Sequence, residues 1–394
     1  MRRLPIALIA VGALALSGCS ASGTGTTSSS SKEPIVVGSI NALSGPATFS
    51  EASQAAKAVF DEVNATGGIQ GRQIKYEITD DKGDPATASA NARQLVGSDG
   101  AVALVGSASL LECQVNAPYY EQNDVLSIEG TGVDPKCFST SNISPVNVGP
   151  YLDTQMALTY GSEVLKKQKI CVLLENQGSS TPAFRAAISA WSKTTGRKLY
   201  RLFDSVPFGA SDYTPYVANA KRAGCDTIFA NNVQPDALAQ IKAAESQGWN
   251  DVTFLYLTST YSVQFAKAAQ GAVGAGVYVP AEFAPYDDPN TTATKAWRAL
   301  MTKKGIQLTS FGQGGYLAAT YFVNVLKSIK GEINRESVTK ALRAMKPVTN
   351  PMVGTPWVFG TAQSHSSNRA GYPVALLPGK KAWQATGDKP LVIR

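Results

Sequence analysis

The sequence contains a single histidine, His365, among its 394 residues. Serine and cysteine nucleophiles need a histidine or another positioned base, and His365 lies in a serine-rich stretch near the end of the chain, where we expect a solvated loop residue. GxSxG, HExxH and GxxxxGK[ST] motifs are also missing from the sequence. A hydrolase that uses two carboxylates is not excluded, but nothing selects such a pair. We therefore predict a binding protein with no catalytic residue and no cofactor.

Long apolar runs are missing after residue 18, so no later segment is expected to span a bilayer. Residues 1–18 hold Arg2 and Arg3 followed by an apolar segment, a pattern typical of a signal peptide. The segment ends in Leu16-Ser17-Gly18-Cys19, which resembles a bacterial lipobox. That resemblance implies cleavage before Cys19, lipidation of its thiol and anchoring at the extracytoplasmic face of the cell membrane. The alternative is an ordinary secretory signal.

Charge is also sparse, at 16% of residues, and the formal net charge is +7. Lysines and arginines are scattered, without a basic run interleaved with aromatic residues, so we expect no nucleic-acid partner. A basic surface near anionic polymers explains the charge more simply. Residues 20–31 consist only of Ser, Ala, Gly and Thr, a composition typical of a flexible tether. Together with the lipidated cysteine, this tether is expected to occupy residues 19–32.

Cysteine is scarce, and the CxxC spacing of many metal sites is missing. Apart from Cys19 the chain has an even number of cysteines, which in an exported protein indicates disulfides. We predict a bond between Cys113 and Cys137, in loops after neighbouring strands. A second bond is predicted between Cys171 and Cys225, which begin two strands expected to be adjacent. The alternative for either pair is buried free thiols, and no metal site is expected.

What the sequence does contain is a regular alternation of strands and helices. An apolar strand at residues 35–40 is followed by a turn and by a helix that stops at Gly67-Gly68. Further strands are expected at residues 73–79, 101–106, 125–129, 169–174, 198–204, 227–230, 253–257 and 276–279. Residues 291–345 are expected to be mostly helical, with short strands after residue 355. The pattern predicts an α/β fold with parallel sheets, and its restart after residue 152 indicates a second domain.

An acidic turn at Asp80, Asp81 and Asp84 precedes the second expected helix. Asp84 suits the N-cap position, and Pro85 suits the first helical position. Three carboxylates so close together are also able to bind a cation. Capping and turn formation explain them without one.

Three short words of sequence, in order, resemble the type I periplasmic solute-binding proteins of ABC transporters, in particular the branched-chain amino-acid-binding family. They are LSGP at residues 43–46, NATGGIQGRQI at residues 64–74 and DDKGDP at residues 80–85. The resemblance covers residues 34–394 and weakens after about residue 350. It implies two Rossmann-like lobes joined by a three-strand hinge, with the ligand in the cleft between them. The expected lobes are residues 33–152 plus 282–348 and residues 153–281 plus 349–394.

The same resemblance implies a partner and a mechanism. A lobe pair of this kind closes around a small-molecule solute and delivers it to an ABC transporter permease. We expect a monomer that meets the membrane only through its lipid anchor. Two alternatives remain: a surface sensor of the same fold that signals to a membrane partner, and a cleft enzyme that turns over the bound compound.

Candidate ligand-binding residues lie in loops after the expected strands, where open α/β folds bind small molecules. From these loops and from the family resemblance we select Ser109, Leu110, Thr131, Gly132, Ser179, Asn232 and Thr258. Among the aromatic residues Phe49, Tyr286, Phe311 and Tyr316, Phe49 and Phe311 rank first because they fall near site-lining positions of family members. Each aromatic residue taken singly is more often part of a core.

Two of these positions depart from the family pattern. Leu110 matches the serine that takes the ligand carboxylate, with Ser109 one residue away, and Thr258 matches the acid that takes the ligand ammonium. Since removal of such a carboxylate costs several kcal/mol in general, we expect α-amino acids to bind poorly unless Glu129, Glu175 or Glu282 substitutes. The resulting hypothesis is a solute without the α-ammonium, such as an aromatic or aliphatic carboxylate or an amide.

Overall fold

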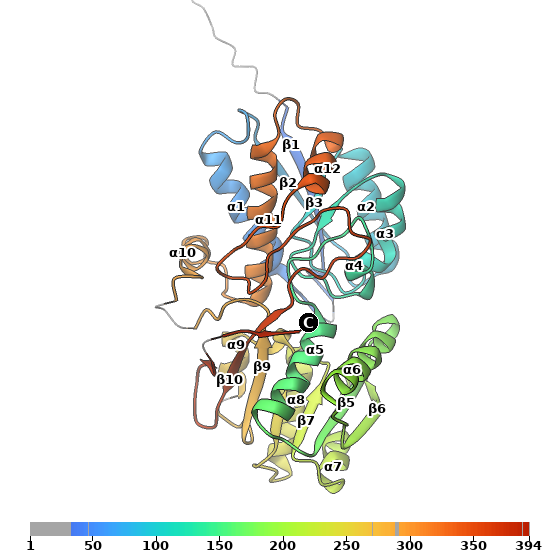
Figure 1. Cartoon of the computed structure of the whole chain (residues 1–394), viewed down its shortest axis with the longest axis vertical. Helices are drawn as coiled ribbons and strands as arrows, with labels where there is room; N and C mark the ends of the chain where they lie inside the picture. Colours follow the sequence, from blue (N-terminus) through green and yellow to red (C-terminus); the bar gives the residue numbers. More distant parts are fainter. Residues whose placement is uncertain (1–32, 46, 270, 288–290, 388, 394) are drawn as a thin grey trace, which may run out of the picture.

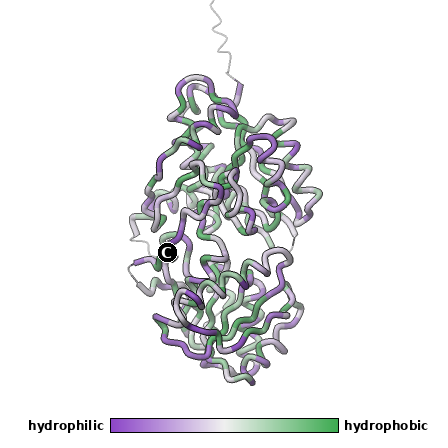
Figure 2. The backbone as a smooth tube through the Cα atoms, turned by 45° about the vertical axis from the view of Figure 1, so that its right-hand side comes forward, coloured by the Kyte–Doolittle hydropathy of each residue, from purple (hydrophilic) through white to green (hydrophobic). Residues whose placement is uncertain are grey.

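The structure is a computed structural model that describes residues 33–45, 47–269, 271–287, 291–387 and 389–393. The predicted signal peptide, Cys19 and the tether lie outside the described residues. Figure 1 shows two lobes, one above the other, and Figure 2 shows apolar backbone stretches running through the interior of each lobe. None of the helices in the described ranges combines the length and apolarity needed to cross a bilayer.

The upper lobe in Figure 1 is built on a parallel sheet with the strand order β2-β1-β3-β4. Its strands are β1 (Ile35–Asn41), β2 (Ile74–Asp80), β3 (Leu104–Val105) and β4 (Ser127–Ile128). β1 is buried along almost its whole length, as expected for a strand covered on both faces. β3 is shorter than predicted at both ends; at its end the chain turns at Gly106, whose φ of 78° suits glycine.

Helices surround this sheet. They are α1 (Ser50–Ala65), α2 (Pro85–Arg93), α3 (Glu112–Gln122), α4 (Pro135–Phe138), α10 (Lys295–Lys304), α11 (Ser310–Ser328) and α12 (Arg335–Ala344), with the π-helical turn η1 (Gln94–Ser98) after α2. Asp84 caps α2 as predicted, accepting a hydrogen bond of 2.7 Å from the Thr87 N–H. α11 lies against α1 (Figure 1) because Gly315 has no side chain: a Cβ there would stand 1.8 Å from the Ala52 carbonyl oxygen.

The lower lobe contains a larger sheet in the order β11-β10-β9-β8-β7-β5-β6, with β12 also paired to β10. The strands from β5 to β9 are parallel, whereas β10 runs antiparallel to β9, β11 and β12. The strands are β5 (Ile170–Asn176), β6 (Arg201–Pro207), β7 (Thr227–Ala230), β8 (Thr253–Leu255), β9 (Gly276–Ala281), β10 (Ala370–Leu376), β11 (Gln384–Ala385) and β12 (Leu391–Val392).

The helices of the lower lobe alternate with its strands along the chain, as predicted, beginning with α5 ahead of β5. They are α5 (Pro150–Thr159), α6 (Thr181–Thr195), α7 (Thr214–Arg222), α8 (Gln234–Ser246) and α9 (Val263–Ala269), with the short turns η2 (Tyr160–Val164), η3 (Gly178–Ser180) and η4 (Thr258–Thr260). The predicted α/β fold with parallel sheets in two lobes is confirmed.

The chain passes between the lobes before α5, after β9 and before β10. Asn368, on the last of these passages, ties the other two: its Nδ2 donates to the Glu282 carbonyl at 2.9 Å and to the Val146 carbonyl at 3.4 Å. Ahead of it, Trp357 packs on the upper lobe, where its Nε1 donates to the Pro145 carbonyl and its ring stacks on Tyr321. The limits given above for the two lobes stay predictions.

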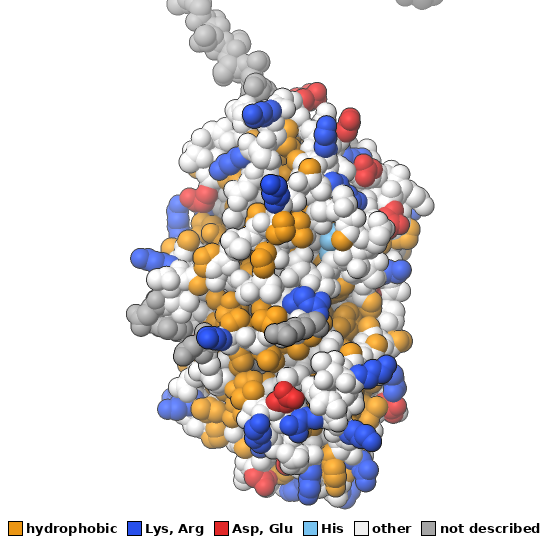
Figure 3. Space-filling model, in the orientation of Figure 1, with side chains coloured by type: hydrophobic (Ala, Val, Ile, Leu, Met, Phe, Trp, Pro, Cys, Tyr) orange, Lys and Arg blue, Asp and Glu red, His pale blue; other side chains and the backbone are white. Residues whose placement is uncertain are grey.

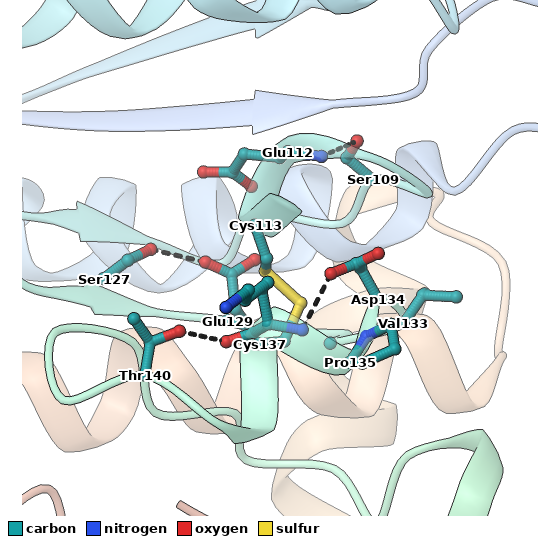
Figure 4. Close-up of a disulfide and its surroundings, with 12 residues drawn as sticks. Ser109, Glu112, Cys113, Ser127, Glu129, Val133, Asp134, Pro135, Cys137 and Thr140 are labelled. Carbon is teal, nitrogen blue, oxygen red and sulfur yellow. Dashed lines mark hydrogen bonds between the residues drawn. A yellow bond between two sulfur atoms is a disulfide. The ribbon is translucent and has the colours of Figure 1, made fainter. Parts of the chain in front are cut away.

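Both predicted disulfides form. Cys113 bonds to Cys137 and Cys171 to Cys225. The first pair joins the helices α3 and α4, not two loops, and Figure 4 shows it beside the buried side chains of Glu112 and Glu129. The second pair links β5 to the segment before β7, strands that are neighbours in the sheet as expected.

Candidate functional site

Two neighbouring hollows, with part of their walls in common, lie where the lobes meet. The inner cavity has a volume of about 60 Å³ and the outer chamber about 270 Å³. Their shared walls are Phe49, Val233, Thr258, Ser259 and Phe311. On the face drawn in Figure 3, hydrophobic side chains gather across the middle of the molecule, whereas Lys and Arg side chains are spread over both lobes.

Both lobes contribute apolar residues to the walls, and those of the upper lobe include two aromatic rings in contact. Phe49 immediately precedes α1 and Phe311 lies in the first turn of α11; their rings meet edge to face, with centroids 4.8 Å apart. Leu110 and Val133 follow β3 and β4 and line the inner cavity. Such a surface favours an apolar part of a ligand, because burying apolar area is worth about 25 cal/mol per Å².

The lower lobe contributes polar groups from the loop after β7. Asn231 is structural: its Oδ1 accepts from the Glu175 N–H at 2.7 Å, and its Nδ2 donates to the Glu175 carbonyl at 3.0 Å. The next residue, Asn232, lines the inner cavity and is 1% exposed, yet within the described residues neither its Oδ1 nor its Nδ2 has a hydrogen-bond partner. A buried polar group left unpaired costs about 1–3 kcal/mol. Asn232 thus offers both a donor and an acceptor to a ligand.

Two buried carboxyl groups also line the inner cavity. Asp153, in the first turn of α5, accepts the Thr258 N–H on Oδ2 at 2.7 Å, while its Oδ1 has no described partner. Glu282 Oε1 accepts from Asn147 Nδ2 at 3.0 Å and from the Gly149 N–H at 2.7 Å. Asp153 Oδ1 is therefore a buried carboxyl oxygen of the cavity wall that can meet a donor on a ligand.

The ionisation of this pair is shifted by its surroundings. Burial raises the pKa of Asp153 well above its usual range, and the nearby Glu282 charge raises it further. Burial also raises the pKa of Glu282 to about 7, against the lowering effect of its bonds to Gly149 and Asn147. The pair therefore holds a proton near neutral pH unless a cationic group enters the cavity.

Direct contacts join the two lobes around the hollows. Thr258 Oγ1 donates to Ser310 Oγ at 3.2 Å, and Gln264 Nε2 donates to Gln307 Oε1 at 2.6 Å. On the other side of the cleft, Ser179 Oγ donates to Gln114 Oε1 at 2.5 Å. The lobes are therefore closed on each other in this structure.

Residues 34–380 match the family described as periplasmic binding protein. The chain belongs to this family. An "Amino acid binding protein" of Pseudomonas aeruginosa is 24% identical over 358 residues, which cover 88% of this chain and 84% of that protein. Relatives of this kind are binding proteins, and this periplasmic binding protein is likewise not an enzyme.

Solved structures share the fold. The branched-chain amino acid transporter substrate binding protein LivJ from Streptococcus pneumoniae, in complex with isoleucine, matches with a TM-score of 0.74 at 19% identity, covering 91% of this chain and 100% of that one. A solute binding protein of an ABC transporter from R. palustris, in complex with 4-hydroxybenzoate, matches with a TM-score of 0.74 at 17% identity, covering 91% and 97%.

The binding protein brings most of the sequence-selected residues together. The hollows are lined by Phe49, Leu110, Thr131, Gly132, Asn232, Thr258 and Phe311. Ser109 and Ser179 are not among the lining residues. Ser109 Oγ instead caps α3, accepting from the Leu111 and Glu112 N–H groups, and donates to Asp81. The sequence shows that these loops contain hydroxyl side chains. It does not show which of those hydroxyls already form hydrogen bonds within the protein.

Several other expectations are resolved by burial. Three acids were expected to be able to replace the missing partner of a ligand ammonium, and of these only Glu282 lines one of the two hollows. Glu129 instead accepts a hydrogen bond from Ser127 Oγ. Glu175 accepts one from Gln240 Nε2, and burial is the main cause that raises its pKa to about 9. Tyr286 donates its hydroxyl to the Tyr261 carbonyl and, like Tyr316, is not a lining residue.

The prediction that His365 is a solvated loop residue is wrong. It is 3% exposed, not solvated, and its Nδ1 lies 3.1 Å from the Thr140 carbonyl oxygen. Burial lowers its pKa. The serine-rich stretch misled the prediction because those serines lie on a segment that packs against the upper lobe.

Sequence analysis missed Asp153 and Asn147. Asp153 looks like an ordinary acid in the first turn of a helix, where the helix dipole favours it. Its proximity to Glu282 arises only from the passage of the chain between lobes.

Within the described ranges, no group of three or more His, Cys, Asp or Glu side chains is placed to hold a metal ion.

Proposed function

We propose that the protein is the lipid-anchored, extracytoplasmic solute-binding subunit of an ABC importer. It captures a small amino acid or a related carboxylate or amide by hinge closure and delivers it to the permease. The observation that carries this proposal is Asn232, whose amide is buried between the lobes, with neither its donor nor its acceptor paired to any residue that the structure describes. A bound solute satisfies both groups.

Hinge closure is supported by the way the lobes are connected. The three passages between them are held side by side by the Asn368 side chain. Beyond these passages the lobes touch through polar bonds such as Gln264 to Gln307, a backbone bridge between Ser262 and Thr309, and the packed rings of Tyr261 and Tyr286. Bonds of this strength, about 0.5–1.5 kcal/mol each, permit opening and closing around a solute.

The solute's polar head is assigned to the inner cavity. There Asn232 offers a donor and an acceptor, and Asp153 offers a carboxyl oxygen. Because Thr258 stands where the family pattern has an acid, the hypothesis of a solute without an α-ammonium still applies. Asp153 and Glu282 are the groups that an α-ammonium would meet. Both kinds of polar head, with and without an α-ammonium, have precedents among similar proteins: one relative is named an amino acid binding protein, and solved structures contain isoleucine and 4-hydroxybenzoate.

The anchor and the partner follow from the sequence expectations. Cleavage before Cys19 and lipidation of its thiol would hold the protein at the membrane, with residues 19–32 as tether. A tether of this length reaches at most about 45 Å when extended. The protein is then a monomer that can meet a permease in the same membrane.

A thermal-shift screen of the mature chain tests the proposal. The compounds are leucine, isoleucine, valine, leucinamide, benzoate and 4-hydroxybenzoate. A ligand at a hundred times its Kd adds about 2.7 kcal/mol to the free energy of unfolding, which raises Tm by several degrees. Asn232→Leu should abolish the shift for every active compound. If no compound of either head type shifts Tm, the proposed ligand class is wrong.

A further inference from the structure

Most of the open space in the cleft lies outside the inner cavity. A water molecule takes up about 30 Å³ in the liquid, so the inner cavity of about 60 Å³ holds on the order of two waters and the outer chamber of about 270 Å³ on the order of nine. The inner cavity therefore suits only the head of a solute. The remainder of any larger solute must lie in the outer chamber.

The boundary between the two spaces is largely apolar: of the five residues that line both, Phe49, Val233 and Phe311 are apolar, whereas Thr258 and Ser259 carry hydroxyls. Phe49 and Phe311 line both of them, and their edge-to-face contact forms part of the shared wall. A methylene chain or another apolar linker suits such a boundary, because it contacts the rings without burying an unpaired polar group.

The outer chamber has the opposite character. Its walls carry the side-chain amides of Gln234, Gln264 and Gln307, together with the Thr309 hydroxyl. One described lining residue is ionisable as an acid, Glu51 in the first turn of α1, and none of the described lining residues is a lysine, arginine or histidine. Within the described part of the chain Glu51 has no ion pair and no hydrogen bond to another side chain; its carboxyl accepts from its own backbone N–H, and burial raises its pKa.

From this arrangement we infer a second subsite in the cleft, which rests on the function proposed above. The outer chamber binds the far end of an elongated solute, and Glu51 selects a far end that carries an ammonium or another cationic donor. The preferred solute is then an amino acid or amide with an apolar middle and a terminal amine. The helix dipole explains why an acid is tolerated at Glu51, but not why the chamber around it lacks a cation.

Calorimetric titration of the mature chain with two matched pairs of compounds tests this subsite. Norleucine and lysine differ by a terminal ammonium, and so do hexanamide and 6-aminohexanamide. In at least one pair the aminated member should bind about tenfold tighter, since hydrogen bonds to charged groups are worth more than neutral ones. Glu51→Gln should remove that advantage. Glu62→Gln, the same change on the same helix but at an exposed ion pair with Lys303, should keep it.

The outcomes separate the two proposals. Equal affinity within both pairs, or an advantage that survives Glu51→Gln, overturns the subsite and leaves the solute-binding function standing. Failure of all four elongated compounds while leucine or benzoate binds also overturns the subsite. Failure of every compound, short and long, overturns the proposed ligand class itself.

Discussion

Two of the buried carboxyl pairs in the described part of the chain differ in what surrounds them. In the upper lobe, Glu112 accepts from Tyr120 Oη at 2.6 Å and Glu129 from Ser127 Oγ at 2.5 Å, and neither lines a hollow. At the junction of the lobes, Asp153 and Glu282 both line the inner cavity. Burial raises the pKa of all four. A shifted pKa alone therefore does not mark a binding site; access to a cavity does.

The largest expected effect concerns the disulfide beside the first pair (Figure 4). Its cysteines are separated by 24 residues in sequence, so replacing both with serine should lower the free energy of unfolding by about 3.5 kcal/mol. Urea unfolding measures the loss. If solute affinity also fell more than fivefold, the region of Glu112 and Glu129 would not be independent of the cleft, and the comparison would fail.

A pH series on Glu129→Gln tests the first pair directly. In the unfolded chain a glutamate titrates near pH 4.3, whereas burial raises the pKa of Glu129 in the folded chain to about 7. The stability that the protonated form provides is complete below about pH 4.3 and is lost as the pH rises toward 7. The variant should therefore be more stable than the native chain at pH 8, by on the order of 3 kcal/mol, and equal to it near pH 4.

Urea unfolding at the two pH values provides the measurement, and solute affinity should stay within twofold. An equal difference in unfolding free energy at pH 4 and pH 8 would contradict the role assigned to burial at this position. A large loss of affinity would instead connect the pair to the cleft.

In the second pair, Asp153 and Glu282, a substitution should change the affinity for the solute. Asp153→Ala removes the free carboxyl oxygen of the inner cavity and leaves the Thr258 N–H unpaired, so we expect about a hundredfold loss of affinity for the solute found by screening. Asp153→Asn keeps an acceptor for Thr258 and should lose about tenfold. Calorimetric titration distinguishes the two, with Glu112→Gln as the control from the first pair. Unchanged affinity in Asp153→Ala would remove Asp153 from the site.

The smallest expected effect on solute affinity is that of removing the hydrogen bond between Ser179 and Gln114, which joins the two lobes away from the hollows. Ser179→Ala deletes this bond, whose acceptor Gln114 lies on α3 next to Cys113 in the upper lobe. Solute affinity should fall about two- to fivefold, chiefly through faster release. Ser205→Ala on the exposed strand β6 is the control and should change neither affinity nor release rate. Slower release in Ser179→Ala would show that this bond opposes closure.

Much of the fold was predictable because its signals are local. Glycine stops, Asp84 as a cap and apolar strands of regular spacing specify the elements, and an even number of cysteines indicated both disulfides. The shortness of β3 and β4 was not predictable, since it depends on where the chain turns toward the cleft. The antiparallel addition of β10 to the second sheet also depends on contacts between distant segments.

The site was only partly predictable for the same reason. Loops at the ends of strands pointed to Leu110, Thr131, Asn232 and Thr258, which do line the hollows. Whether a hydroxyl is available depends on its other partners, and Ser109 is occupied by capping α3. The pairing of Asp153 with Glu282 arises from residues far apart in sequence, and no local pattern records it.

The position of β10 has a consequence for synthesis. The lower sheet is completed only when β10 is inserted between β9 and β11, and the upper lobe needs α10, α11 and α12, which are also made late. Neither half can reach its final form while the ribosome is still making the chain's first three hundred residues. Such a nascent polypeptide stays incompletely folded until translation is nearly finished, a property suited to a chain expected to be threaded through a narrow translocation channel before it folds.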